Sequence, residues 1–294
     1  MRRDEVNSSG SSSPPIVLSS HLLWSLPVAK AAQVASSLDF QGLEIWTEHL
    51  WREDHLSELK EQLAQISLRY FLHAPFMDLN PCSRNPRVAQ LSLAEQLEAL
   101  QLARELGIEL VVVHPGHCSS SKDSPAEFWP PLLESLEELE SEAEKLGITL
   151  AVENMEPRPK EFMVRPMDFA WLFQEIPGLN LCLDLAHAAA VGEDALNGFV
   201  EQLAGRICHV HLSNVGEGKV HLPLDRGRLP VTPAVSRFLL EFTGAITLEG
   251  AAEPAFKTAQ LGLARLRKLV KGGDTEDRPK LSSSENPPIE GGTS

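Results

Sequence analysis

The sequence has no long apolar run, no closely spaced pair of cysteines and no excess of basic residues. None of its 294 residues fall in an apolar stretch of about 18 or more, so we expect no membrane-spanning helix. Serines follow the charged first residues where a secretory signal would have an apolar segment, which predicts no such signal. No C-x-x-C pair occurs among Cys82, Cys118, Cys182 and Cys208. This spacing excludes a zinc ribbon or dithiol redox motif and favours reduced thiols in a cytoplasmic protein.

Basic residues are too few for a general nucleic-acid binder. The chain has 26 Lys and Arg against 41 Asp and Glu, a formal net charge of −15. Nucleic-acid affinity comes largely from Lys and Arg that neutralise phosphates and release counterions. The charge therefore weighs against nucleic acid as a partner, although a local basic groove stays compatible with it.

Two terminal segments have the composition of disordered chain. Residues 1–14 include a Ser-rich run, and residues 271–294 are rich in Gly, Ser, Pro and charge. Between them, short runs rich in Val, Ile and Leu alternate with longer amphipathic segments, as in parallel strands covered by helices. The predicted strands are Ile16–Ser20, Leu43–Trp46, Leu68–His73, Leu110–His114, Ile148–Glu153, Leu179–Asp184, Ile207–Leu212 and Ala245–Glu249.

Eight strands that each precede a helix are typical of a (β/α)₈ barrel. The alternative is an open doubly wound sheet, but no Gly-rich phosphate loop follows any strand. We therefore predict a single-domain α/β protein with a (β/α)₈ TIM barrel over residues 15–270.

Helix boundaries are predicted from capping motifs. Ser92 and Glu95 form an S-x-x-E capping box for a helix over 91–106 that ends at Gly107. Residues 124–127, Ser-Pro-Ala-Glu, form a second box before a helix over 128–146. Thr232 and Pro233 predict another helix start.

Charged or imidazole side chains end six of the eight predicted strands. These residues are His73, His114, Glu153, Asp184, His211 and Glu249. His187 follows Asp184 by three residues, and His221 lies in the loop after the seventh strand. Since the carboxyl ends of barrel strands meet at one rim, these groups would share one pocket. Carboxylates there would repel one another unless cations compensate them, and His with carboxylate suits zinc, manganese or iron.

These residues carry a resemblance to a known superfamily. Asp184-Leu-Ala-His187 and His209-Val-His211-Leu-Ser, with Glu153 before and Glu249 after, resemble the xylose isomerase-like barrels, which include sugar isomerases and epimerases and endonuclease IV. The segments His73-Ala-Pro75, Asn80-Pro81 and His114-Pro-Gly116 are similar to the endonuclease IV pattern.

The resemblance implies specific metal ligands. In the epimerase branch, four residues hold one metal, and the two glutamates also act as acid and base: Glu153, Asp184, His211 and Glu249. In the endonuclease branch, His73 and His114 join Glu153 at a second metal. There, His187 and His221 hold a third metal with an aspartate, whose position is occupied by Lys219 in this sequence. An ammonium group at that position puts the third metal in doubt.

Two enzymatic functions follow from the resemblance. The first is a metal-dependent isomerase or epimerase of a small sugar, polyol or sugar phosphate, with Glu153, Glu249 and His187 as catalytic residues. The second is a zinc phosphodiesterase that cleaves abasic DNA. A non-enzymatic metal or sugar binder ranks third, because both glutamates are present. The expected cofactor is one to three divalent ions of Mn, Mg or Zn, and the oligomeric state stays open, a homo-oligomer included.

Other polar residues have alternative interpretations. We expect Glu44 to accept a hydrogen bond rather than to bind the metal, and His209 to be structural. Basic residues in two loops could bind an anionic substrate group or lie free in solvent: Arg158, Lys160, Arg165, Arg226 and Arg228. Trp46, Trp51 and Trp129 could stack on a substrate or cover helix ends, whereas a plain loop role is favoured for His117 and Cys118.

Overall fold

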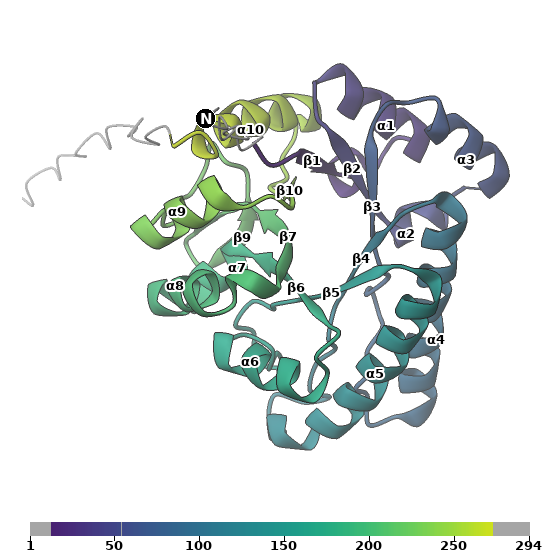
Figure 1. The fold of residues 1–294 in the computed structure, drawn as a ribbon, viewed down its shortest axis with the longest axis vertical. Coiled ribbons are helices and arrows are strands. Elements are labelled where there is room, and N and C mark those ends of the chain that lie inside the picture. The colour runs from purple at the N-terminus through teal and green to yellow at the C-terminus, as the bar shows by residue number, and fades with distance from the viewer. Residues whose placement is uncertain (1–12, 54, 273–294) are drawn as a thin grey trace, which may run out of the picture.

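A closed barrel of eight parallel strands lies at the centre of the molecule, as the sequence predicted. The structure is a computed structural model that describes residues 13–53 and 55–272. Neighbouring strands are hydrogen-bonded in the order β1-β10-β7-β6-β5-β4-β3-β2, and helices surround them (Figure 1). The terminal segments predicted to be disordered lie almost wholly outside the described residues, and that prediction is not tested.

The barrel strands are short and their apolar residues are almost completely buried. Parallel strands covered by helices have this composition because both faces are removed from water. The eight strands are β1 (Ile16–Ser19), β2 (Gly42–Trp46), β3 (Arg69–His73), β4 (Leu110–Val113), β5 (Thr149–Glu153), β6 (Asn180–Asp184), β7 (Ile207–Leu212) and β10 (Ala245–Leu248).

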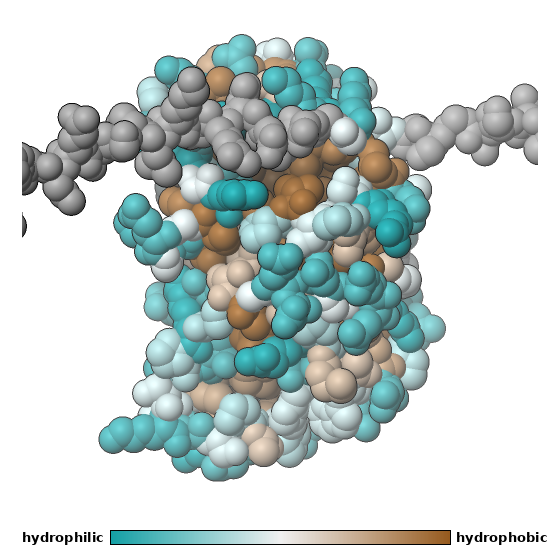
Figure 2. Space-filling model, turned by 90° about the vertical axis from the view of Figure 1, so that its left-hand side faces the viewer, coloured by the Kyte–Doolittle hydropathy of each residue, from teal (hydrophilic) through white to brown (hydrophobic). Residues whose placement is uncertain are grey.

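Amphipathic helices pack around the barrel and separate its strands along the chain. The α-helices are α1 (Val28–Ser37), α2 (Thr47–Leu50), α3 (Leu56–Ala64), α4 (Pro86–Leu106), α5 (Trp129–Leu146), α6 (Pro166–Glu175), α7 (Leu185–Val191), α8 (Glu193–Gln202), α9 (Pro233–Glu241) and α10 (Ala255–Leu269). The 3₁₀ helices are η1 (Ser20–Leu23), η2 (Pro125–Glu127) and η3 (Ala204–Arg206). None of the helices in the described part of the chain is long and apolar enough to cross a membrane. On the side shown in Figure 2, hydrophilic side chains cover most of the surface, with smaller hydrophobic patches between them.

The inside of the barrel holds a small apolar core below a polar layer. Two small apolar clusters occupy it, and one consists of Val112, Ala151 and Cys182. Cys182 is fully buried in this cluster. The polar residues of the candidate site therefore lie on a packed floor.

The predicted start of helix α4 was wrong. The helix begins at Pro86, and the side chain of Asn85 accepts a hydrogen bond from the amide of Arg87 at 3.1 Å. Ser92 lies inside the helix, donates to the carbonyl of Val88 and accepts from the amide of Asn80, both at 2.7 Å. The S-x-x-E pattern failed because the tertiary contact with Asn80 occupies the serine.

The second predicted capping box was also wrong, whereas the predicted helix ends hold. Ser124 makes no capping hydrogen bond, residues 125–127 form η2, and Glu127 pairs with Arg84 at 2.6 Å. Helices α4 and α5 end at Gly107 and Gly147, whose φ angles of 74° and 69° are those that glycine adopts without strain. Thr232 caps α9 as predicted, since its hydroxyl accepts from the amide of Val235 at 3.2 Å.

A hairpin of two strands was missing from the predicted fold. Strands β8 (Asn214–Gly216) and β9 (Lys219–Leu222) form an antiparallel hairpin between β7 and α9. His221, which the sequence placed in a loop, belongs to β9 and has a φ angle of 56°. A pair this short carries no hydrophobic alternation, so the sequence gave no periodic signal for it.

Candidate metal centre

The side chains of the predicted four-residue metal site meet at one rim of the barrel. Glu153 ends β5, Asp184 ends β6, His211 lies near the end of β7, and Glu249 follows β10. Each is at most 3% exposed. One ligand atom from each residue lies within 4.8 Å of the other three.

Strand register explains why these residues meet. Asp184 is paired with His211 across β6 and β7, and Glu153 is paired with Cys182 across β5 and β6. Residues two apart on a strand point to the same side, so Asp184 lies one layer above Cys182 inside the barrel. The ligands therefore occupy successive layers at the carboxyl end.

The unsatisfied atoms of this cluster fit a cation. The buried atoms Asp184 Oδ2 and His211 Nδ1 make no hydrogen bond in the structure. Nδ1 of His211 lies 3.3 Å from an oxygen of Glu153 and 3.4 Å from one of Glu249. Buried polar atoms are normally paired, and a divalent cation would satisfy all of these atoms at once.

The pKa values of the carboxylates in this cluster also favour a bound cation. Burial and the carboxylates of Glu153 and Asp184 raise the pKa of Glu249 to about 8. Burial opposes ionisation of Glu153 too, but the imidazoles of His211 and His114 hold its pKa well below the usual range. Without a cation, the site therefore retains a proton on Glu249 to limit carboxylate repulsion.

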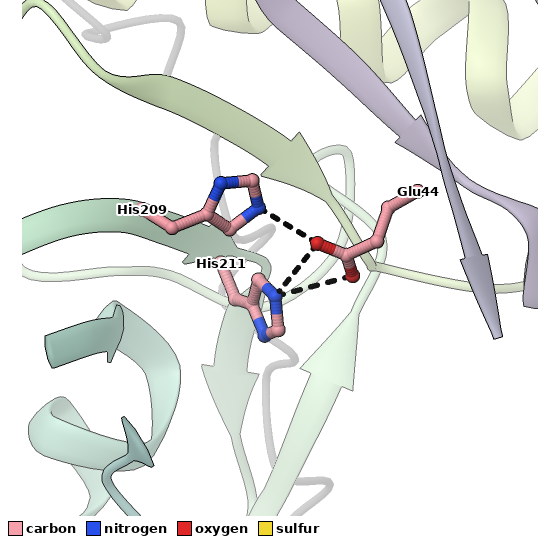
Figure 3. Close-up of side chains that lie close together, drawn as sticks. All are labelled: Glu44, His209 and His211. Carbon is pink, nitrogen blue, oxygen red and sulfur yellow. Dashed lines mark hydrogen bonds and ion pairs between the residues drawn. The ribbon is translucent and has the colours of Figure 1, made fainter. Parts of the chain in front are cut away.

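Glu44 lies beside the ring nitrogens of both His209 and His211 (Figure 3). Nε2 of His211 donates to Glu44 Oε2 at 3.2 Å, which leaves Nδ1 free for the cluster. Nε2 of His209 lies 2.7 Å from the same oxygen and 2.8 Å from the hydroxyl of Thr247. A carboxylate that holds the far nitrogen of a ligating histidine fixes its tautomer and ring orientation. The structure thus gives Glu44 and His209 the supporting positions expected from the sequence.

A second cluster consists of His73, His114 and Glu153. Nε2 of His73 and Nε2 of His114 lie 3.3 and 3.2 Å from Glu153 Oε2. Nδ1 of His73 donates to the carbonyl of Ala74 at 2.9 Å, so its Nε2 is the nitrogen that can face a cation. Burial lowers the pKa of His73, but Glu153 outweighs it and raises the value to about 9. A proton on His73 therefore occupies the place that a cation would take.

A third cluster consists of Asp184, His187 and His221. Nε2 of His187 lies 3.0 Å from Nε2 of His221. Nδ1 of His187 donates to the carbonyl of Asn154 at 2.8 Å, and its amide donates to Asp184 Oδ1 at 2.6 Å. The ligand atoms of the three residues lie within 4.8 Å of one another. All eight predicted metal ligands are thus brought together in three adjoining clusters.

Lys219 does not occupy the place of a ligand in the third cluster. It begins β9, is exposed, and is absent from the cavity lining of the described chain. Water screens an exposed ammonium group, so its repulsion of a nearby cation is weak. Asp184 supplies the carboxylate in this cluster instead.

A cavity of about 770 Å³ opens above the clusters. Besides metal-site residues, its charged lining consists of Asp78, Glu156, Glu161 and Arg158. Arg158 forms an ion pair with Glu156, so its charge is already compensated. Of the five basic loop residues considered from the sequence, Arg158 alone lines this cavity within the described chain.

Five further residues illustrate what sequence order could not show. Trp46 and His117 line the cavity, whereas Trp51 is 57% exposed and lies outside its lining. Trp129 packs against Trp171, with ring centroids 4.2 Å apart. His21 also lines the cavity and was missed. Its only signal was that a polar residue closely follows the first strand.

The turn after β4 requires glycine at position 116. Gly116 has a φ angle of 88°, and a Cβ atom there would lie 2.8 Å from Asn80 Oδ1 and 3.1 Å from Cys82 Sγ. We expect Gly116→Ala to lower the free energy of unfolding by about 3 kcal/mol through strain and overlap. Gly107→Ala is the control, because its φ is 74° but nothing lies within 4 Å. The Gly107→Ala protein should lose only about 1 kcal/mol of unfolding free energy, measured by urea denaturation. Equal losses in the two variants would show that the structure relieves the overlap at position 116.

The family follows from the match of this chain to known proteins. A family model described as the xylose isomerase-like TIM barrel matches residues 32–269. The chain belongs to this family. Its members therefore provide the comparison for the clusters described above.

Relatives of the chain carry names from both branches. It is 26% identical over 242 residues to the uncharacterized protein MJ1188 of Methanocaldococcus jannaschii, covering 80% of this chain and 87% of that one. It is 27% identical over 226 residues to a probable endonuclease 4 of Mycobacterium ulcerans, covering 73% and 85%. A solved structure of a D-tagatose 3-epimerase-like protein is 26% identical, with a TM-score of 0.75 and coverage of 87% and 98%.

Proposed function

We propose that this protein is a metal-dependent isomerase or epimerase of a small sugar or polyol. The observation that carries the proposal is the placement of Glu153 and Glu249, which line one cavity and flank Nδ1 of His211 at 3.3 and 3.4 Å. In the barrel, β5 and β10 are separated by β6 and β7. A substrate between the two glutamates would therefore have a carboxylate on each side.

This arrangement suits a reaction in which a proton leaves one face of a carbon and returns on the other. Glu153 has a lowered pKa and is ionised, so it can accept a proton. Glu249 holds a proton at neutral pH in the cation-free protein, because burial raises its pKa to about 8. With a cation bound, which displaces the proton of Glu249, one of the two glutamates would remove the substrate proton and the other would return it.

The chain's other residues hold the substrate and limit water. A divalent cation bound by Glu153, Asp184, His211 and Glu249 would polarise a substrate carbonyl and acidify the adjacent C–H bond. His187 is fixed by hydrogen bonds to Asn154 and Asp184, so its Nε2 has a defined position from which to bind a substrate oxygen. The rings of Phe76 and His114 stack with centroids 4.3 Å apart on one side of the cavity.

A second candidate, an endonuclease IV-like phosphodiesterase, is favoured by the two flanking clusters. His73, His114, His187 and His221 are more imidazoles than one metal requires. The cavity charge opposes this function, because the only Lys or Arg among the described residues that lines it, Arg158, is paired with Glu156. A phosphodiester substrate needs unpaired cations at its phosphates.

Hydrogen exchange with solvent tests the proposal directly. The protein, stripped of metal and reloaded with Mn²⁺, would be incubated in ²H₂O with D-fructose, D-tagatose and other free ketoses. We expect one deuterium at the carbon next to the carbonyl of an accepted sugar, together with its epimer or isomer, detected by NMR and mass spectrometry. The Zn²⁺-loaded protein would be assayed in parallel on a duplex with one abasic site. Cleavage of that duplex without deuterium in any sugar would overturn the proposal and establish the second candidate.

A further inference from the structure

One wall of the cavity is formed by residues that belong to none of the three clusters. It is formed by His21, which follows β1 in η1, and by Trp46, which ends β2. Their rings are stacked, with centroids 4.6 Å apart and an interplanar angle of 25°. Trp46 also contacts His73 and Phe76, at centroid distances of 5.5 and 5.1 Å. This wall is therefore packed firmly against the metal-facing residues.

His21 has one ring nitrogen bound and one free. Nδ1 lies 3.0 Å from the hydroxyl of Ser19, a fully buried residue. Nε2 makes no hydrogen bond to any described residue, although the ring lines the cavity. An imidazole held by stacking and by one hydrogen bond has little rotational freedom left to lose. A ligand that meets its free nitrogen would therefore bind at a small entropic cost.

We propose that His21 is a substrate-binding residue whose Nε2 hydrogen-bonds a hydroxyl group of an uncharged, polyhydroxylated substrate. The inference rests on the proposed function, because it places a sugar or polyol in the same cavity. It assigns His21 no part in proton transfer.

The surroundings of His21 explain why the partner is an uncharged hydroxyl group. Burial and the neighbouring imidazole of His221 lower the pKa of His21 to about 3, so the ring is neutral at physiological pH. A neutral imidazole offers no charge to a phosphate or carboxylate. Asp78 and Glu161 also line the cavity, and their carboxylates would repel an anionic substituent when ionised, although burial raises the pKa of Glu161 to about 7. The cavity thus selects against sugar phosphates, which the sequence had left as an alternative.

Ligand binding tests this assignment separately from turnover. D-fructose and D-fructose 6-phosphate would be titrated into the Mg²⁺-loaded protein, with dissociation constants from saturation-transfer NMR. We expect the wild type to bind free D-fructose more tightly than its 6-phosphate. His21→Phe keeps a flat ring but removes the hydrogen bond, and should weaken D-fructose binding roughly five- to tenfold. His21→Gln, which restores a polar group, should stay within about threefold of the wild type.

His49→Gln is the matched control. The His49 ring also packs against a tryptophan, Trp24, at 5.2 Å, and its Nε2 donates to the carbonyl of Leu26, but it does not line the cavity. Its substitution should leave D-fructose binding unchanged even if it lowers the melting temperature. Unaltered binding by a folded His21→Phe protein, absence of D-fructose binding by the wild type, or preference for the phosphate would each overturn the assignment. The binding pattern would support it even if the wild type exchanged no hydrogen, an outcome that contradicts the proposed function alone.

Discussion

Adding Mn²⁺ or Zn²⁺ to the metal-free protein is expected to stabilise it by several kcal/mol. Three buried carboxylates, Glu153, Asp184 and Glu249, share one cluster with His211, and two atoms of this cluster have no hydrogen-bond partner among the described residues. A cation that binds only the folded state adds about 4 kcal/mol at 1,000 times its dissociation constant. For a chain of this size, this corresponds to a rise of roughly 10 °C in the melting temperature, measurable by calorimetry after chelation and reloading.

The stabilisation should grow with pH. The pKa of Glu249 is raised from its usual value of 4.5 to about 8 without a cation, so the folded state holds a proton that the unfolded state has lost. The cation-free protein therefore loses stability from this group as the pH rises from 4.5 to 8. A cation must displace this proton below pH 8, which lowers its apparent affinity by about tenfold per pH unit.

Asp184→Asn provides a sharp test of the metal effect. Asparagine keeps an oxygen that can accept the hydrogen bond from the His187 amide, now 2.6 Å long, but it removes the charge. We expect the variant to fold and to lose most of the metal-induced shift in melting temperature. Asp78→Asn, a cavity-lining change outside the clusters, should retain the full shift. If no divalent metal tested changed the melting temperature of the wild type, the proposed mechanism would lose its basis.

Replacing Glu153 or Glu249 by glutamine is expected to reduce deuterium exchange into the substrate by about 10³-fold. General acid–base catalysis contributes 10²–10⁴-fold in rate, on the order of the loss when one partner is removed. Glu153→Gln should also weaken metal binding, because Glu153 belongs to both the four-residue cluster and the His73–His114 cluster. Metal content of each purified variant separates loss of the cation from loss of proton transfer.

The control for these variants is a glutamate at the opposite end of the barrel. Glu109 is exposed and precedes β4, so it lies at the amino-terminal rim. Glu109→Gln should retain exchange within about twofold. If Glu153→Gln and Glu249→Gln both kept wild-type exchange, the two-glutamate mechanism would be wrong.

Much of the fold was predictable because each strand carries a local signal. Short apolar runs such as Leu110–Val113 need no distant residue to be identified, and the glycines after α4 and α5 fix where those helices end. Helix starts were less predictable. Ser92 has the residue type of a cap, but its hydroxyl serves the amide of Asn80, twelve residues away. A contact of this kind depends on how a loop returns to a helix.

The candidate site likewise contains residues that the sequence predicted and residues that it did not. Six of the eight predicted ligands could be located because they end apolar runs, where packing does not require charge, whereas His187 and His221 were assigned from the family resemblance. The placement of His21 could not be predicted, because a histidine in a 3₁₀ helix of four residues has no periodicity that shows its direction. The hairpin that carries His221 was missed for a similar reason, since its strands are too short for a pattern.

By itself, the sequence determined that polar side chains end the strands of a closed parallel barrel, because apolar periodicity and strand order are local properties. Tertiary structure alone decided which of those side chains face one another. Glu44 and His211 are 167 residues apart and come from β2 and β7, yet one hydrogen bond joins them across the barrel. Closure of the barrel sets that distance, whereas the parallel pairing of β1 with β2 brings His21 beside Trp46 at the cavity wall.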